Sequence, residues 1–312
     1  MTFGIIALFL LMIYLLTTFI MFLLISRKSK KSLMAVIRNS VENSVKPFQE
    51  IIDIGHHWME EKLESKEVED VSITSHDGLK LHGILIQNPN AKGIMIECHG
   101  YRSTAKFDLF TSCHEYYDLG YSLLLIDERT SNMSEGKYIT LGIRESEDII
   151  QWCEYVNHRF VGMPIILAGI SMGASSVLMA VKDLGEDKNV KAVMADCGYV
   201  SAWDEVIYCL NHYFHLPGKC FIHMINFWCL VLAKFSLKEK NTIECIKDAK
   251  IPILFVHGEE DDYVPKENSF RNYEEYAGTK KLVLFPKANH GTSYLVDPKK
   301  YVKMVEEFLN AI

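Results

Sequence analysis

The sequence predicts an α/β protein with a mostly parallel central sheet, helices on both faces, a helical cap insertion and a transmembrane helix ahead of the folded domain. Three observations support this prediction. Strand-length apolar runs alternate with helix-like segments after residue 92, which is typical of a parallel sheet. An aromatic segment without strand signals interrupts this alternation once, and the first 26 residues are almost entirely apolar.

The composition is that of a globular protein with a sizeable core. The chain has 312 residues, of which 49% are hydrophobic and 23% charged. A net charge of −7 argues against nucleic-acid binding, so we expect small molecules or a membrane as partners. The eight cysteines form no C-x-x-C pair, which favours reduced core residues in a reducing compartment. Neither a metal nor a cofactor is expected, and the oligomeric state is left open.

Residues 1–26 are interpreted as a membrane anchor. Phe3 to Ile25 is an uncharged run long enough to cross about 30 Å of hydrocarbon as a helix. A secretory signal peptide is the alternative, but no Lys or Arg precedes the run and no A-x-A-like cleavage site follows it. The basic residues come afterwards, so the positive-inside rule places the folded domain on the cytoplasmic side of the cell membrane. Reversed topology and late cleavage stay open. These basic residues are Arg27, Lys28, Lys30, Lys31 and Arg38.

Residues 27–66 are expected to form a helical linker, because apolar positions recur at helical spacing over 32–64, with a break at Pro47. The domain follows at 67–312. Its first two strands flank Asp77-Gly78, which is a hairpin signal. We expect strands at 71–74, 79–86, 92–98, 121–126, 165–168, 190–195, 251–257 and 281–285, and helices at 107–117, 144–155, 174–180, after Pro265 and at 299–309.

The cap is predicted at about 198–244, inserted between two sheet strands. This segment carries more aromatic residues than one crossover helix needs, among them Trp203, Tyr213 and Trp228. Some of them would serve an ordinary core helix equally well. We expect the cap to lie over the mouth of the site and to favour apolar or aromatic acyl groups.

The strand 165–168 leads into Gly169-Ile170-Ser171-Met172-Gly173, followed by a helix of small residues. The order strand, sharp turn, helix is that of a G-x-S-x-G nucleophile elbow, in which a strained turn exposes the serine hydroxyl. Ser171 is therefore the candidate nucleophile. The N–H of Met172 points to the place where an oxyanion would form. The second oxyanion donor should follow the strand 92–98, where Tyr101 comes after His99-Gly100.

A serine hydroxyl needs a base and a group that orients the base. His290 follows the strand 281–285, and an acidic cluster at 259–262 follows the strand 251–257, so both lie at the sheet edge that carries Ser171. His290 is the candidate base and Asp261 the candidate acid. The neighbouring acids of the cluster and Asp196, after the preceding strand, remain alternatives. His99 and His257 precede tight-turn glycines and are read as structural.

At these residues the sequence resembles the α/β-hydrolase superfamily, and within it the bacterial membrane-anchored serine hydrolases related to cinnamoyl esterases and serine aminopeptidases. The resemblance covers about 71–309. It implies that the aspartate four positions before Pro265 in the Val-Pro motif, Asp261, is the triad acid. The motifs are Asp77-Gly78-Leu79-Lys80-Leu81, His99-Gly100-Tyr101, the elbow, His257-Gly258 and Ala288-Asn289-His290.

One motif departs from the family pattern Asp-x-Arg-x-His-Gly-x-Ser-x-Gly. Ser131 and Asn132 replace His and Gly after Asp127 and Arg129. We expect Asp127 and Arg129 to hold the loop and the replaced pair to shape the wall of the site.

The sequence thus predicts a serine hydrolase that cleaves an ester through a Ser-His-Asp triad and an acyl-enzyme. A peptidase and a thioesterase are the alternatives within enzymes, because one triad serves all three bonds. A non-catalytic, membrane-tethered binding module is the alternative from another class.

Overall fold

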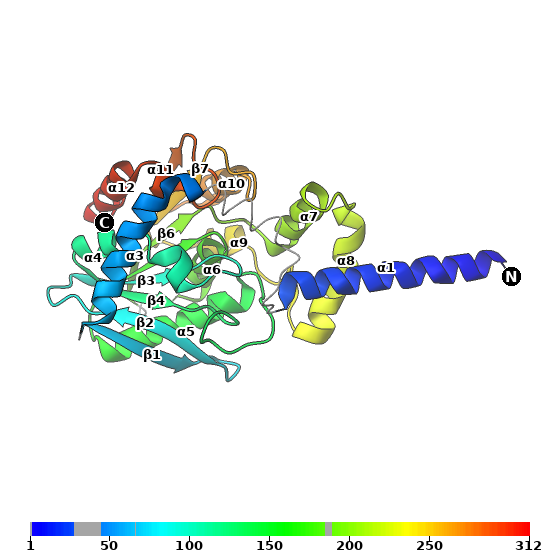
Figure 1. Ribbon diagram of the computed structural model, residues 1–312, viewed down its shortest axis with the longest axis horizontal. Coiled ribbons are helices and arrows are strands. Elements are labelled where there is room, and N and C mark those ends of the chain that lie inside the picture. Colours follow the sequence, from blue (N-terminus) through cyan, green and yellow to red (C-terminus); the bar gives the residue numbers. More distant parts are fainter. Residues whose placement is uncertain (1, 28–44, 66, 185–188) are drawn as a thin grey trace.

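Figure 1 shows the computed structural model of the chain, a body built around one sheet with a long helix projecting from it. The structure describes residues 2–27, 45–65, 67–184 and 189–312. The part of the linker predicted to be helical at 32–44 therefore lies outside the described residues. The boundaries of the anchor (1–26), the linker (27–66) and the folded domain (67–312) stay a prediction.

The described residues form one eight-stranded sheet in the order β1-β2-β4-β3-β5-β6-β7-β8. The strands from β3 onward run parallel, whereas β2 is antiparallel to both β1 and β4. Each predicted strand is present, and the fold class is confirmed. The strands are β1 (Val68–Thr74), β2 (Lys80–Ile86), β3 (Gly93–Cys98), β4 (Tyr121–Ile126), β5 (Ile165–Ile170), β6 (Val190–Asp196), β7 (Ile253–Gly258) and β8 (Lys280–Phe285).

Helices cover both faces of the sheet, as Figure 1 shows. Because side chains alternate along a strand, each strand contributes to a separate apolar core on either side. One face packs against α3 (Gln49–Leu63), α4 (Cys113–Asp118), α11 (Ser293–Val296) and α12 (Pro298–Asn310). The other face of the sheet packs against α5 (Ile143–Arg159), α6 (Met172–Ala180), α9 (Thr242–Ile246) and α10 (Glu267–Glu275).

The helix expected at 107–117 is broken in the structure. A π-helical turn, η2 (Ala105–Leu109), is followed by a separate short helix, α4. Thr104 begins the turn, since its side chain accepts a hydrogen bond from Phe107 N. Asp108 within it accepts one from Gly100 N, so this segment is folded back onto the loop after β3 rather than continuing as one helix.

The segment 198–244 is helical, with α7 (Ala202–His212), α8 (Gly218–Trp228) and the π-helical turn η5 (Cys229–Ala233) ahead of α9. Together with α1 (Thr2–Ser26) it forms a third apolar core, in which Phe22 of α1 is fully buried. The linker helix α3 lies elsewhere, against η2 and α4. A Cβ on Gly55 would stand 2.4 Å from Phe110 O, so this glycine permits the close contact.

Candidate active site

The turn between β5 and α6 has the strained geometry that the sequence predicts. Ser171 adopts φ 55° and ψ −117°, a conformation that is costly for a residue other than glycine. Glycine is required on either side of the Ile170-Ser171-Met172 segment, because a Cβ there would clash with neighbouring backbone. A Cβ on Gly169 would stand 2.4 Å from Gly173 C, and one on Gly173 would stand 2.2 Å from Cys98 O. The turn therefore holds Ser171 at the carboxyl end of β5, above the sheet.

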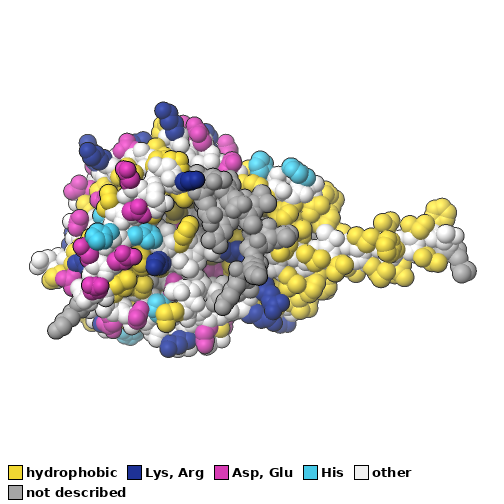
Figure 2. Space-filling view, viewed as in Figure 1, with side chains coloured by type: hydrophobic (Ala, Val, Ile, Leu, Met, Phe, Trp, Pro, Cys, Tyr) yellow, Lys and Arg dark blue, Asp and Glu magenta, His cyan; other side chains and the backbone are white. Residues whose placement is uncertain are grey.

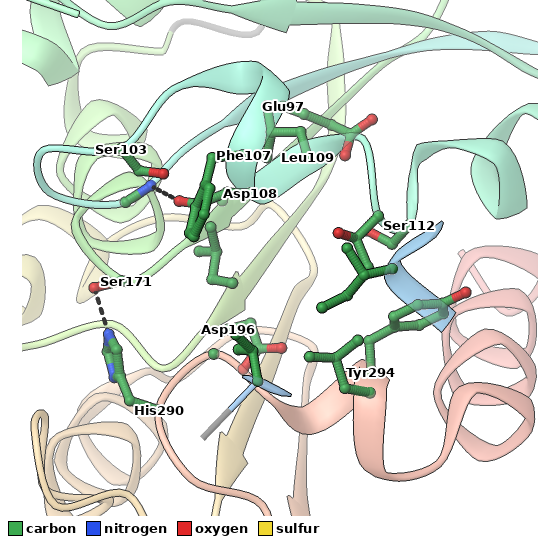
Figure 3. Close-up of a pocket in the computed structure, with 18 of the residues that line it drawn as sticks. Glu97, Ser103, Phe107, Asp108, Leu109, Ser112, Ser171, Asp196, His290 and Tyr294 are labelled. Atoms are coloured by element: carbon green, nitrogen blue, oxygen red, sulfur yellow. Dashed lines mark hydrogen bonds between the residues drawn. The ribbon is translucent and has the colours of Figure 1, made fainter. Parts of the chain in front are cut away.

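The structure brings Ser171, His290 and Asp261 together from three separate loops. Ser171 Oγ lies 2.8 Å from His290 Nε2, and His290 Nδ1 lies 2.8 Å from Asp261 Oδ2. Figure 3 shows the serine and the imidazole facing each other at one end of a cavity. All three residues are buried. This chain of hydrogen bonds is the arrangement in which an imidazole can take a proton from a hydroxyl.

Among the acidic candidates, Asp261 is the residue whose carboxylate contacts the His290 ring. Its Oδ1 accepts hydrogen bonds from Tyr263 N at 3.0 Å and Val264 N at 2.8 Å, which fixes the carboxylate. Asp196 is buried but accepts a hydrogen bond from Ser293 Oγ instead. The remaining acids of the cluster, Glu259, Glu260 and Asp262, are exposed.

Charge stabilises this arrangement. Burial by itself would raise the pKa of Asp261, but the charge of His290 and hydrogen bonds from His257 and His290 hold that pKa well below its usual range. For His290 the signs are reversed. Burial by itself would lower the pKa of this histidine, but the Asp261 carboxylate raises that pKa well above the ordinary value. The carboxylate thus stays ionised, and it is positioned so that it can stabilise a positive charge on the His290 imidazole.

His257 has a further contact that the sequence did not predict. Its Nε2 lies 3.2 Å from Asp261 Oδ2, and its Nδ1 lies 2.7 Å from Ser269 Oγ. It therefore contacts the same carboxylate oxygen that binds His290 and helps to hold it in place. The position of His257 one residue before Gly258 at the end of β7 was the only sequence signal, and it was read as structural.

The loop after β3 lies beside Ser171. A Cβ on Gly100 would stand 3.3 Å from Ser171 Cβ, and Gly100 N donates a hydrogen bond of 2.7 Å to Asp108 Oδ2. Met172 is the first residue of α6, so its N–H is one of the amides that a helix leaves without an intrahelical partner. The hydroxyl of Tyr101 donates to Ile25 O in α1 at 2.7 Å. No sequence pattern indicates a role for Asp108 at the site.

A cavity of about 930 Å³ extends from Ser171 and His290 beneath the sheet face that carries α3. Its walls are mostly apolar, from the strands, η2 and α11. Polar side chains occur at both ends, with Ser103 and Asp108 on the Ser171 side and Glu97 and Tyr294 at the far end. The wall residues include Leu109, Ala168, Ile170, Met194, Val256 and Leu295, and the polar residues include Glu97, Tyr116, Asp196, Tyr294 and Tyr301.

The cap does not line this cavity. None of the residues 198–244 is among those that surround it, whereas Gln49, Ile52 and His56 of α3 are. The cap instead contacts the loop that carries Asp261, because the hydroxyls of Tyr208 and Tyr213 donate to Asp262 O. That the cap lies over the mouth and favours apolar acyl groups stays a prediction. Aromatic content indicated that the cap buries apolar surface, and the structure shows that α1 takes up much of it.

The altered motif after β4 also differs from expectation. Arg129 pairs with Asp148 and Asp77, so it holds the loop as predicted. Ser131 and Asn132 are not wall residues of the cavity. Ser131 Oγ donates to Ser103 O at 2.6 Å and Asn132 Nδ2 donates to an oxygen of Asp127 at 2.8 Å, so the pair stands behind the wall and braces it.

Cys197 brings a thiol close to the acid and the base. Its Sγ and one ligand atom each of Asp261 and His290 lie within 4.8 Å of one another. Burial raises the pKa of this thiol to about 11, so it stays protonated and is a poor metal ligand. Since Asp261 and His290 already bind each other, these two residues fit a proton relay with Ser171 better than a metal site.

Residues 110–312 match the prolyl oligopeptidase family. Among curated proteins, the uncharacterized protein YqkD of Bacillus subtilis is 28% identical over 262 residues, covering 83% of this chain and 84% of YqkD. The uncharacterized protein YfhR of Escherichia coli K12 is 25% identical over 231 residues, covering 71% of this chain and 73% of YfhR. The family match at 110–312 includes Ser171, Asp261 and His290, whereas the loop that carries Tyr101 lies before the matched residues.

Solved structures share the fold. The Pyrococcus furiosus esterase Pf2001 superposes with a TM-score of 0.66 at 23% identity, covering 78% of this chain and 91% of the esterase. Est1E from Butyrivibrio proteoclasticus superposes with a TM-score of 0.58 at 20% identity, covering 78% of this chain and 98% of Est1E. At such identities the likeness concerns the α/β-hydrolase fold alone.

Proposed function

Because the chain belongs to the prolyl oligopeptidase family and is a hydrolase with the α/β-hydrolase fold, we propose that it cleaves carboxylic esters of apolar or aromatic acyl groups through Ser171, His290 and Asp261. The observation that carries this proposal is the unbroken chain of hydrogen bonds from Ser171 Oγ to Asp261 Oδ2. The mostly apolar cavity that begins at Ser171 supports the choice of acyl group.

The reaction would proceed in two halves. Ser171 Oγ attacks the ester carbonyl while His290 Nε2 takes its proton, and the N–H groups of Met172 and Tyr101 stabilise the oxyanion. The tetrahedral intermediate collapses, the alkoxide leaves as an alcohol with the proton from His290, and the acyl group stays on Ser171. Water then attacks the acyl-enzyme as His290 accepts a water proton. The acid is released, and the proton returns to Ser171.

A peptidase of the same site is the second candidate, because the matched family is named for a peptidase. The ester is preferred since an alcohol leaves more readily than an amine, and since the cavity that begins at Ser171 is mostly apolar. A thioester would be cleaved by the same steps. Solved structures that share the fold include an esterase, which adds support for the ester.

We further propose that α1 is a retained single-pass anchor in the cell membrane, with the catalytic domain on the cytoplasmic side. Within the described residues α1 is the one helix long and apolar enough to cross a membrane. The carboxyl end of α1 is hydrogen-bonded to the body. The Arg102 side chain donates to Leu24 O, and Ile139 N donates to Ser26 O. Arg27, which follows the helix, forms a backbone β-bridge with Tyr138. Removal of α1 as a signal peptide would leave these groups without their partners.

Labelling by a fluorophosphonate, combined with a substrate panel, tests the proposed function. The full-length protein in detergent should react, and Ser171→Ala should not, while the matched variant of an exposed serine, Ser72→Ala, should react as the wild type does. p-Nitrophenyl esters should be cleaved faster than aminoacyl anilides. Absence of labelling in the wild type would favour a non-catalytic binding module, and equal labelling of Ser171→Ala would refute the site.

A further inference from the structure

Glu97 is a buried carboxyl group with an unused acceptor. It lies in β3, is 3% exposed, and its Oε1 has no hydrogen-bond partner within the described part of the chain. Burial raises its pKa to about 8, and no neighbouring positive charge offsets this effect. A buried carboxyl without a partner is costly, so its retention in the core calls for a group that completes it.

Glu97 lines the cavity that begins at Ser171, at the opposite end. Figure 3 shows Ser171 and His290 on one side, Glu97 and Tyr294 on the other, and Asp196 between them. Glu97 pairs in register with Ala168, which is three residues before Ser171. With a rise of about 3.3 Å per residue and about 4.8 Å between strands, the two Cα atoms stand about 11 Å apart. An extended chain of about nine atoms covers that distance.

The groups around this far end are acidic or phenolic. Asp196 is a second buried carboxyl, which lies between Ser171 and this end, and Tyr301 lies close to both Asp196 and Tyr116. The basic residues of the wall, Lys46 and Arg102, do not act on the charge of Glu97. A cationic donor would meet the unpaired acceptor of Glu97 there, whereas an anion would meet the Glu97 carboxyl group, with the Asp196 carboxyl along the way. Charge and hydrogen-bonding capacity thus both favour an ammonium group.

We propose that the Glu97 end of the cavity binds a primary ammonium group at the far end of the acyl chain, so that amino-terminated acyl esters of about nine chain atoms are preferred substrates. This inference rests on the proposed function, because it assigns the specificity of the same site. Glu97 would be a specificity residue with no part in the chemical steps at Ser171.

The test compares two esters of equal length, p-nitrophenyl 8-aminooctanoate and p-nitrophenyl nonanoate. The wild type should cleave the amino ester with a kcat/KM at least about ten-fold higher, since a charged hydrogen bond is gained. Glu97→Gln should lose that preference, so that its kcat/KM values for the two esters become equal within about two-fold. The exposed control Glu274→Gln should behave as the wild type does. Equal preference in wild type and Glu97→Gln would overturn the inference, and failure of the wild type to cleave either ester would overturn the proposed function.

A different part of the molecule, helix α1, makes its first contacts with the body at Tyr14. The hydroxyl of Tyr14 donates to Cys220 O, and Trp228 Nε1 donates to Thr18 Oγ1, so α1 packs against α8. About 20 helical residues are needed to cross about 30 Å of hydrocarbon. Any 20-residue window within Thr2–Ser26 includes Tyr14–Met21, which touches α8. A spanning α1 therefore brings α8 into the hydrocarbon region.

The outer surface of the cap fits that position. Four large apolar side chains at the end of α8 and in η5 are exposed, and Figure 2 shows hydrophobic side chains continuing from the projecting helix onto the cap beside it. Basic residues stand where α1 and η5 end, at Arg27, Lys137 and Lys234, and would face anionic headgroups. The apolar side chains are Phe227, Leu230, Val231 and Leu232.

We propose that this face of α8 and η5 is inserted into the same bilayer leaflet that α1 leaves, so that the cap is a membrane-embedded element. The inference goes beyond the anchor itself, because it assigns a second lipid-contacting surface to the folded domain. It depends on the anchor and not on the catalytic residues.

The depth of the cap can be measured with a bimane label at Val231→Cys. The background is Cys220→Ser, since Cys220 is the exposed one among the eight cysteines. The full-length protein is placed in phosphatidylcholine–phosphatidylglycerol nanodiscs with or without 5-doxyl phosphatidylcholine, and fluorophosphonate labelling checks its folding. The doxyl lipid should quench the bimane at position 231 several-fold more than one at Val161→Cys, an exposed position on the body. Equal, weak quenching at both positions would overturn the inference.

Discussion

The two ends of the cavity differ in how far their polar groups are satisfied. At the Ser171 end, His290 and Asp261 bind each other, and Asp261 also has two backbone donors. At the Glu97 end, a buried carboxyl oxygen has no partner among the described residues. The first end is organised for chemistry before substrate arrives, whereas the second becomes complete only with a ligand group. The comparison separates the residues expected to set the rate from those expected to set the choice of acyl chain.

The largest effect is expected from Ser171→Ala. Loss of the nucleophile should lower kcat on p-nitrophenyl butyrate by about 10⁴-fold or more. The decrease should be the same for short and long acyl chains, because the far end of the cavity is untouched. Steady-state kinetics on both chain lengths measures this. A loss confined to one chain length would show that Ser171 acts in substrate binding rather than in chemistry.

Asp261→Asn should lower kcat by about 10⁴-fold, because the amide cannot hold His290 in the same tautomer or stabilise its charged form. The matched variant is Asp262→Asn, an exposed neighbour that should retain nearly full activity. A large loss in Asp262→Asn together with an active Asp261→Asn would move the acid assignment to the neighbouring residue.

Ala168→Phe should separate the two ends. Ala168 lines the cavity between Ser171 and Glu97, so a larger side chain there would obstruct the path between them. We expect kcat/KM for nonanoate esters to fall by about ten-fold or more, and that for acetate esters to change little. Measurement of both esters on the same preparation is the check, with circular dichroism to confirm folding. An equal loss on both esters would mean that long acyl chains do not follow this cavity.

The smallest effect is a shift in pH dependence. His290 acts as base only when neutral, and its pKa is raised by Asp261, so kcat/KM should fall as the pH is lowered through a value above the ordinary histidine pKa of about 6.5. Since His257 supports Asp261, His257→Gln should move this acid limb by a fraction of a pH unit and keep most of the activity. A pH–rate profile from pH 5 to 9 measures both. An acid limb below pH 6 in the wild type would contradict the conclusion that the Asp261 carboxylate raises the pKa of His290.

The sequence predicted the Ser171 end far better than the Glu97 end. Gly169, Ser171 and Gly173 form a local pattern, because a sharp turn leaves no room for a Cβ on either side of the serine. His290 and Asp261 follow strands whose order fixes the edge at which they emerge. Glu97, by contrast, stands within an apolar strand and gives no periodic signal. The role proposed for Glu97 depends on a cavity that is lined also by residues far away in the chain, such as Tyr301.

The cap shows why composition locates a segment better than it assigns its contacts. Its helical content follows from apolar spacing and from the absence of strand signals. Which surface it covers depends on where α1 packs, and contacts such as Phe19 with Trp228 join residues that are far apart in the sequence. The same reason explains why the contact between Tyr101 and Ile25 could not be predicted.

The most direct test of the central claim is to trap the acyl-enzyme. The full-length protein is mixed with excess p-nitrophenyl butyrate and quenched in acid within the first turnover, and its peptides are then analysed by mass spectrometry. We predict a burst of p-nitrophenol and a butyryl group on the peptide that contains Ser171, with accumulation of that adduct in His290→Ala being far slower. A butyryl group on another residue, or hydrolysis with no adduct on Ser171 at any time, would contradict the proposed mechanism.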